Sequence, residues 1–363
     1  MRVVVAGGGY GGLACLAELS RCCRDVEMVL VDPGADHVKQ THLHETVRRP
    51  LARFRIPYKQ LASRFGFRHV QASADLSDLG ATAQRGVLQL DEGNEPFDFL
   101  VVATGASAPP LPKCQGVYDR ADLRALETRA LLDDFLADDA RPPTLTVVGG
   151  GPTGIQFLFE LSDAVSRAAR PLKLRLVDRE PALLREHPAA LGDYVSKKIA
   201  QKDIEYLPGT EYAGCEPGLL QLRGPSGEKQ TVESGLTLLL PGVRPSPLVN
   251  VNRFGHLAAH ENIFAAGDCA RYDARGDDFM TAQVAVRQAK LVARNIDRLS
   301  RGVRPLEYFF RELGYVVSLG PVDAVGWLLL KDQVVSGLPA FAIKEVVEAQ
   351  YDLFVAGLDT YLV

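Results

Sequence analysis

Two features are missing from this 363-residue sequence. No uninterrupted apolar run reaches the roughly 20 residues of a membrane-spanning helix. No block of lysine and arginine is present, and a net charge of -4 gives no general attraction to nucleic acid. Hydrophobic content of 47% and charged content of 24% are ordinary for a soluble globular protein. We therefore expect two or three globular domains, no nucleic-acid partner and no membrane span.

Cysteine pairs with the spacing of a redox relay are also absent. The chain has six cysteines but no CxxC or CxxxxC pattern, and their spacing fits no metal site. Enzymes that reduce disulfides keep such a pair to relay electrons, so that activity is disfavoured. Cys22 and Cys23 are adjacent and are expected to be reduced thiols at the end of the first helix.

A glycine-rich turn of one pattern occurs twice, about 140 residues apart. Each copy lies between an apolar run (residues 3–6 and 145–148) and a stretch with helical periodicity. Such glycines allow a tight turn and close approach to a pyrophosphate, and the following helix offers free N–H groups to phosphates. Two copies predict two nucleotides, typically a flavin and a nicotinamide. The residues of the two turns are Gly7, Gly9, Tyr10, Gly11 and Gly12, and Gly149, Gly150, Gly151 and Gly154.

An acidic residue follows each turn at the end of the next apolar run. Asp32 comes 20 residues after Gly12, where a carboxylate accepts hydrogen bonds from a ribose diol. Asp178 has the same place in the second copy, and it favours NADH because it would repel a 2′-phosphate. The adjacent Arg179 could pair with that phosphate, which leaves NADPH open. Either aspartate could instead be a simple turn or helix cap.

The pattern predicts an α/β fold with two Rossmann-like domains, the second inserted into the first. A Gly turn at residues 103–105 and a Gly-Asp turn at 266–268 each end a further apolar run, and helices are predicted over 122–136 and 282–299. Strands are predicted near 67–74, 86–90, 204–207, 219–222 and 236–240. The domains are predicted as 1–112 with 246–300, 113–245, and a C-terminal region over 301–363.

These motifs together resemble the two-dinucleotide-binding flavoproteins of the pyridine nucleotide-disulfide oxidoreductase superfamily. The resemblance covers essentially the whole chain, and the two glycine turns with the 103–105 and 266–268 turns carry it. Three weaker matches, at 43–45, 241–245 and 282–285, point to the type II NADH dehydrogenases. The resemblance implies a single-subunit NADH:quinone oxidoreductase that uses FAD and NAD(H) and does not pump protons.

The resemblance also implies site residues. FAD would contact the first glycine turn. It would also contact a set of residues outside this turn: Asp32, Ala74, Ala103, Thr104, Gly105, Gly267, Asp268, Ala282 and Gln283. NADH would contact the second turn with Gln156, Asp178, Arg179 and Gly242. A carboxylate at Asp268 would accept hydroxyl hydrogen bonds from the ribityl chain. The helix that starts at Ala282 would place its positive end against the flavin pyrimidine.

Two glutamines are the candidate catalytic residues, although hydride transfer needs no side-chain acid or base. Gln156 stands where the family usually has Glu beside the nicotinamide. Gln283 would face the quinone together with Val284 and Arg287, and the family often has Gln at the position of Arg287. Gln283 could instead only cap the flavin pyrimidine.

The C-terminal region leaves two interpretations open. In the family it carries amphipathic helices that dock on the bilayer. Here residues 338–361 mix apolar and mainly acidic side chains, so a core or dimer-forming helix is as reasonable as a membrane contact. Because the first strand starts at once, we expect a cytoplasmic protein, and peripheral binding to the cytoplasmic face of the membrane is the alternative left open. A soluble electron acceptor and a low-turnover redox sensor remain alternatives to quinone reduction.

Overall fold

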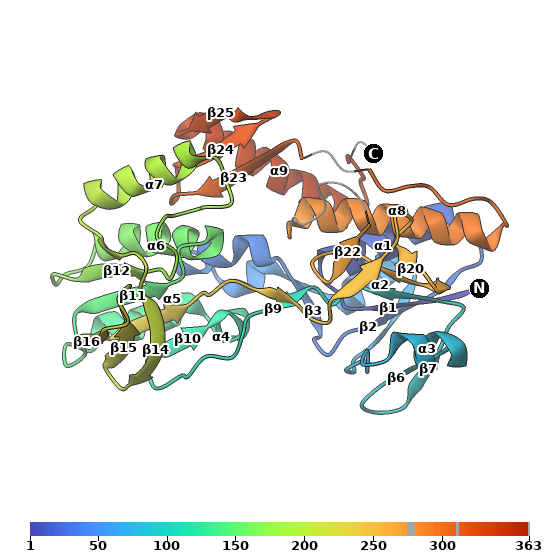
Figure 1. Cartoon of the computed structure of the whole chain (residues 1–363), viewed down its shortest axis with the longest axis horizontal. Coiled ribbons are helices and arrows are strands. Elements are labelled where there is room, and N and C mark those ends of the chain that lie inside the picture. The colour runs from blue at the N-terminus through green and yellow to red at the C-terminus, as the bar shows by residue number, and fades with distance from the viewer. Residues whose placement is uncertain (274–279, 310–311, 362–363) are drawn as a thin grey trace.

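The computed structural model describes residues 1–273, 280–309 and 312–361. It shows an α/β fold with two Rossmann-like units side by side and the C-terminal elements above both (Figure 1). The predicted ranges 246–300 and 301–363 include residues 274–279, 310–311 and 362–363, which lie outside the described residues.

A six-stranded sheet forms the centre of the first unit. Its order is β20-β21-β8-β1-β2-β5, and every neighbouring pair is parallel except β20 with β21. Along β1, Val3 and Val5 pack toward α1 and α8, whereas Val4 and Ala6 enter the core on the other face. The elements are β1 Arg2–Ala6, β2 Glu27–Val31, β5 Phe67–Val70, β8 Phe99–Val102, β20 His256–Leu257, β21 His260–Ala265, α1 Tyr10–Cys22 and α8 Ala282–Ser300.

Smaller elements surround this sheet. The hairpin β6–β7 confirms the strand predicted near 86–90, whereas β5 ends at Val70, short of the predicted 74. These elements are β3 Asp36–Val38, η1 Gln40–Val47, η2 Leu51–Phe54, β4 Arg55–Pro57, α2 Tyr58–Phe65, α3 Leu79–Arg85, β6 Val87–Gln89, β7 Asn94–Pro96, β19 Val249–Val251 and β22 Ala270–Tyr272.

The second unit has five parallel strands in the order β10-β17-β11-β12-β13. A three-stranded antiparallel sheet, β14-β15-β16, lies beside it, and a disulfide joins Cys114 to Cys215 of β14. The cysteine spacing did not predict this bond, because the two residues are brought together only by the fold. The elements are β10 Val117–Asp119, α4 Arg120–Ala125, α5 Thr128–Ala137, β11 Thr144–Val148, α6 Pro152–Val165, β12 Lys173–Val177, α7 Ala189–Gln201, β13 Glu205–Leu207, β14 Glu211–Glu216, β15 Leu219–Arg223, β16 Lys229–Glu233 and β17 Leu236–Leu239.

The predicted helix over residues 122–136 is wrong as a single helix, because the structure divides it into α4 and α5. Asp119 and Asp122 form a capping box that starts α4 earlier. Leu126 then leaves the helix with extended backbone, and the Glu127 carboxylate accepts the backbone N–H of Leu51 at 3.0 Å. A contact with the first unit thus outweighs helical periodicity.

The chain crosses between the units on two short strands. β9 (Ala106–Ser107) leads into the second unit, β18 (Arg244–Pro245) leads out of it, and the two pair antiparallel. This pairing shows the second unit inserted within the first. The exact division at 112/113 and 245/246 stays a prediction.

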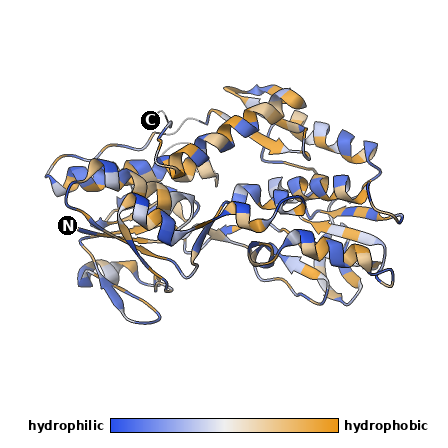
Figure 2. Cartoon of the chain, turned by 180° about the vertical axis from the view of Figure 1, so that it is seen from behind, coloured by the Kyte–Doolittle hydropathy of each residue, from blue (hydrophilic) through white to orange (hydrophobic). Residues whose placement is uncertain are grey.

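The C-terminal segment packs on both units. Its antiparallel sheet contributes Val317, Val325 and Trp327 to the core of the second unit. Tyr351 and Phe354 of its helix enter the core of the first unit. Figure 2 shows the apolar character of the strands and the mixed character of the outer helices. The elements are β23 Gly314–Ser318, β24 Ala324–Leu328, β25 Leu330–Ser336 and α9 Leu338–Val355.

Candidate functional site

The two glycine turns have the same backbone hydrogen bonds. Gly7 donates its N–H to Val31 at 2.8 Å, and Gly149 donates to Val177 at 2.8 Å. A second hydrogen bond, from the residue after β8 or β17, is also the same in both units. The N–H of Ala103 donates to the carbonyl of Ala6, and the N–H of Leu240 donates to the carbonyl of Val148, each at 2.8 Å. The repeat seen in the sequence is therefore a repeat of geometry.

Steric contacts explain why both turns need glycine. Gly7 and Gly149 have φ of 104° and 112°, which side-chain-bearing residues rarely adopt. A Cβ at Gly12 or Gly154 would overlap the carbonyl oxygen of the first glycine of its own turn. These glycines let each helix lie close to its strand.

Gly9 and Gly151, at the third position of their turns, face open space. A Cβ at Gly9 or Gly151 would meet no atom within 4 Å, and neither helix has a side-chain cap at its N-terminus. The first N–H groups of α1 and α6 are thus directed toward room for a phosphate. Both turns fit a dinucleotide pyrophosphate.

The two predicted acidic residues lie beside their turns. The Asp32 carboxylate accepts the N–H of Gly8 at 2.7 Å and of Gly34 at 2.8 Å. Asp178 is buried, which raises the pKa of its carboxyl, and it accepts the N–H of Glu180 at 3.3 Å. Arg179 is exposed and lies 3.7 Å from Glu180.

The Gly-Asp turn meets the first glycine turn and the start of α8. The Cβ position of Gly11 is 3.4 Å from the carbonyl oxygen of Ala266 and 3.7 Å from that of Ala285. Gly267 has φ of 83° and donates its N–H to Oε1 of the buried Gln288 at 2.8 Å. The structure thus gathers three sequence-predicted motifs, and Gln288, whose role the sequence did not reveal, fixes the turn that carries Asp268.

The remaining predicted residues lie as follows. Thr104 donates its hydroxyl to the carbonyl of Ser246 at 2.8 Å, and Ala74 bridges to Leu90 behind the first sheet. Gln283 is half-buried in the first turn of α8, next to a buried Val284. Ala282 and Arg287 on α8 and Gln156 on α6 are also half-buried, whereas Gly242, after β17, is exposed.

Arg120 is a functional candidate that the sequence did not reveal. It begins α4 in the second unit and donates from Nη2 to Oε1 of Gln40 in the first unit at 2.6 Å. Its buried Nε has no hydrogen-bond partner. Asp268 lies within electrostatic reach, where Arg120 opposes the burial that raises the pKa of the Asp268 carboxyl. A cation with a free buried N–H therefore faces the first nucleotide site.

A chain of aromatic residues links α9 to the first glycine turn. His37 donates from Nδ1 to the carbonyl of Gly8 at 3.0 Å and accepts from the Tyr351 hydroxyl at 2.9 Å. Burial lowers the pKa of His37 to about 4, so the ring is neutral and can make both bonds. The Tyr351 ring also lies 4.5 Å from that of Tyr10.

A buried ionic cluster joins α9 to η1. Nζ of Lys344 lies 2.6 Å from Glu348, and His42 lies 3.0 Å from Glu45. His42, Glu45 and Glu348 have metal-like spacing, but the ammonium of Lys344 and the guanidinium of Arg49 already neutralise the carboxylates. We interpret the cluster as an ion-pair network that holds the C-terminal helix.

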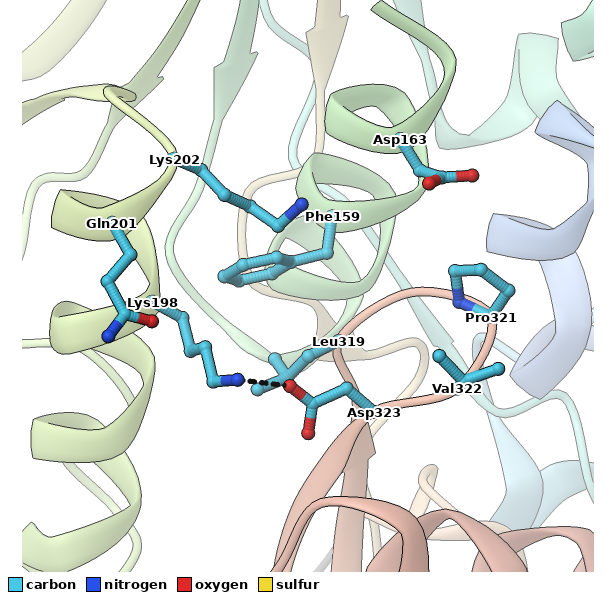
Figure 3. A pocket seen from close by; sticks show the side chains of 9 residues that line it. All are labelled: Phe159, Asp163, Lys198, Gln201, Lys202, Leu319, Pro321, Val322 and Asp323. Atoms are coloured by element: carbon cyan, nitrogen blue, oxygen red, sulfur yellow. Dashed lines mark ion pairs between the residues drawn. The ribbon is translucent and has the colours of Figure 1, made fainter. Parts of the chain in front are cut away.

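A separate cavity of about 260 Å³ lies where the C-terminal sheet meets the second unit (Figure 3). Its walls come from α6, α7 and the β23–β24 turn, and Lys198 pairs across it with Asp323 at 2.7 Å. None of the predicted nucleotide residues lines it. The nucleotide sites are better defined by the glycine turns than by this cavity.

This arrangement is that of a protein with two dinucleotide-binding units, the second of which is inserted within the first. Residues 1–289 match the family model described as pyridine nucleotide-disulphide oxidoreductase. The chain belongs to this family.

Three known proteins show the extent of the similarity. A type II NADH:quinone oxidoreductase of Staphylococcus aureus is 26% identical over 396 aligned residues, with 98% of this chain and 96% of the relative covered. The sulfide:quinone oxidoreductase of Aquifex aeolicus has a similar fold, with a TM-score of 0.81, 19% identity and coverage of 98% and 92%. NDH2 of Plasmodium falciparum, solved with NADH, has a TM-score of 0.80, 14% identity and coverage of 96% and 94%.

Proposed function

We propose that the chain oxidises NADH with FAD and passes the electrons to a quinone without pumping protons. The observation that carries this proposal is the duplicated turn, with identical hydrogen bonds and an uncapped helix in each unit. Type II NADH:quinone oxidoreductases are relatives along essentially the full chain, which supports the choice of NADH and quinone.

FAD is assigned to the first unit. There α1 would hold the pyrophosphate, and Gly267–Asp268 with the start of α8 would hold the ribityl chain and the pyrimidine ring. The unpartnered Nε of Arg120 supports an anion here, because a buried N–H donor without an acceptor is costly. Bound FAD supplies a two-electron acceptor for the hydride of NADH.

NADH is assigned to the second unit. The N-terminus of α6 would bind its pyrophosphate, and Asp178 would accept hydrogen bonds from the adenosine ribose. Gln156 would hold the nicotinamide amide. The protein's part in the transfer is to place both rings in contact and to exclude water, so no side chain has to move a proton in this half-reaction.

The outer face of α9 supports contact with a membrane, where a quinone is dissolved. Leu338, Val346 and Leu353 are 66%, 70% and 41% exposed, and with the exposed Ala342 and Ala349 they form one stripe at helical spacing. Among the described residues, no helix is long and apolar enough to cross a membrane. We propose that this stripe lies in the lipid interface.

A vesicle experiment tests the membrane contact. Exposed acids, Glu345 and Asp352, border the stripe, so we expect flotation with neutral phosphatidylcholine vesicles that resists salt. Val346→Glu should abolish flotation, while Glu345→Gln should not. A protein that stays in solution and runs as a dimer disrupted by Val346→Glu would instead assign the stripe to a second copy.

Steady-state NADH oxidation tests the function itself. The purified holoprotein should oxidise NADH far faster with a short-chain quinone than with oxygen alone. Anaerobic NADH should bleach the flavin band within the turnover time. If NADH bleaches the flavin but quinone does not speed NADH oxidation, the electron acceptor is a soluble molecule. If NADH does not bleach the flavin, the protein is a low-turnover redox sensor.

A further inference from the structure

The two adjacent cysteines at the end of α1 bring their sulfur atoms together. The Sγ atoms of Cys22 and Cys23 are 3.7 Å apart. Successive side chains of a continuous helix diverge by about 100° around its axis. Cys22 is the last helical residue, however, and Cys23 has extended backbone while its N–H still bonds to Leu19 at 2.9 Å. This change of conformation lets both sulfurs lie on one side.

The surroundings expose Cys22 more than Cys23, so a reagent reaches the pair through Cys22. Cys22 is half-buried, with Sγ 3.8 Å from the carbonyl of Ala293 on α8, whereas Cys23 is only 9% exposed. Hydrogen bonding from Cys23 lowers the pKa of the Cys22 thiol. A reagent can therefore bind Cys22 first and then reach Cys23, with the second step intramolecular.

The other cysteines do not compete for such a reagent. All six lie in the described part of the chain. Cys15 and Cys269 are buried, and Cys114 is bonded to Cys215. Burial also raises the pKa of both the Cys15 and the Cys269 thiols, which keeps them protonated.

We propose that Cys22 and Cys23 form a dithiol site for trivalent arsenicals, with arsenic bridging the two sulfurs. With phenylarsine oxide, two S–H bonds and the arsenic–oxygen bond break, two As–S bonds form, and the oxygen leaves with both protons as water. Arsenic stays trivalent, so no oxidant or reductant is needed. This site is independent of the nucleotides and does not rest on the proposed function.

The site also borders the clamp that holds the C-terminal tail. Arg21, the neighbour of Cys22, pairs with Asp359, and so does the buried Lys290 of α8, at 2.6 Å. Turning Cys22 toward arsenic would remove its contact with Ala293 next to this clamp. Occupation of the site should therefore make the chain after α9 more susceptible to proteolysis.

Titration of the holoprotein, with its Cys114–Cys215 disulfide intact, with phenylarsine oxide, followed by intact mass, tests the proposal. Native protein should take up one equivalent, released by ethanedithiol, and peptide mapping should place it on the segment with Cys22 and Cys23. Cys22→Ser and Cys23→Ser should each weaken uptake at least about tenfold, because a single thiol cannot chelate. Cys15→Ser should bind like native protein.

Two results would overturn the site. One is native protein that takes up no arsenical, and the other is an adduct mapped to a different cysteine. Mapping on native protein decides the matter even if a variant folds poorly, and flavin content monitors folding independently.

Discussion

The two nucleotide units share one backbone design but differ in how their surroundings complete it. In the second unit, α6 is framed by the unit's own sheet, by the C-terminal β23–β24 hairpin, and by η1 of the first unit, whose flanking Arg48 pairs with Glu160. In the first unit, residues from far along the chain reach the turn and its surroundings. Tyr351 bonds through His37 to Gly8 of the turn, Gln288 holds the neighbouring Gly-Asp turn, and Arg120 of the other unit bonds to Gln40. The comparison teaches that one local backbone design is completed by different long-range contacts in the two units.

Replacing the last glycine of each turn with valine should have the largest effect on activity. The two substitutions should distinguish the role of the first unit from that of the second. Gly12→Val should lose most of its FAD, because the new side chain overlaps the Gly7 carbonyl. Gly154→Val should keep FAD, but NADH should reduce its flavin at least about a hundredfold more slowly. This corresponds to an activation barrier that is higher by roughly 2.7 kcal/mol. Flavin content and anaerobic stopped-flow reduction measure this. Gly80→Val, on α3, is the control, and full flavin in Gly12→Val would contradict the assignment.

The two glutamines should divide the half-reactions. Gln156→Leu should slow flavin reduction by NADH about tenfold or more, through loss of a hydrogen bond to the nicotinamide amide. Gln283→Leu should slow quinone reduction and leave anaerobic reduction by NADH nearly unchanged. If both half-reactions fall together in Gln283→Leu, this residue caps the flavin pyrimidine and the quinone binds elsewhere.

Removing the cation that the second unit directs toward the first should weaken FAD binding. Arg120→Gln should raise the Kd of the apoprotein for FAD about tenfold, or 1.4 kcal/mol, while Arg120→Lys should lose less. Flavin fluorescence quenching measures this, and the dependence of Kd on salt should also fall. Arg129→Gln is the matched control, because the Arg129 side chain is exposed on α5 and pairs with Asp133. Equal Kd values for all four proteins would remove Arg120 from the site.

Nicotinamide choice should depend on the acidic residue of the second unit. Native protein should prefer NADH over NADPH by well over tenfold in kcat/KM. Asp178→Ala should narrow that preference by about tenfold, with Arg179 available to the 2′-phosphate. Asp32→Ala should leave the preference unchanged. Equal use of both nucleotides by native protein would refute the role of Asp178.

Acid should weaken the link between α9 and the first turn, with the smallest expected effect. The pKa of His37 falls from 6.5 unfolded to about 4 folded, so the unfolded chain binds more protons between these values. The stability that neutral His37 provides is present above pH 6.5 and is lost as pH falls toward 4. His37→Gln should therefore lose roughly 2–4 °C less in Tm than native protein between pH 7 and 5. An equal loss would show that other groups control the acid response.

Particular residues show how far the sequence could be read. Gly12, Gly154 and Asp178 follow local rules, because a turn and its next strand span only some 30 residues. The helix over 122–136 failed because Glu127 bonds to Leu51, which no periodicity reveals. Gln288 was visible in the sequence, but its bond to Gly267 follows from the packing of α8 on the Gly-Asp turn.

By itself, the sequence determined two glycine turns, their strands and helices, and so two nucleotide sites in an α/β chain. These features depend on backbone sterics and on the alternation of apolar residues, which act between near neighbours. Only the tertiary structure decided that Arg120 faces the first site, that Tyr351 reaches Gly8 through His37, and that α9 turns a stripe of apolar side chains outward. Those contacts join residues up to 314 positions apart, and such proximity arises only when buried surfaces and ion pairs are satisfied together.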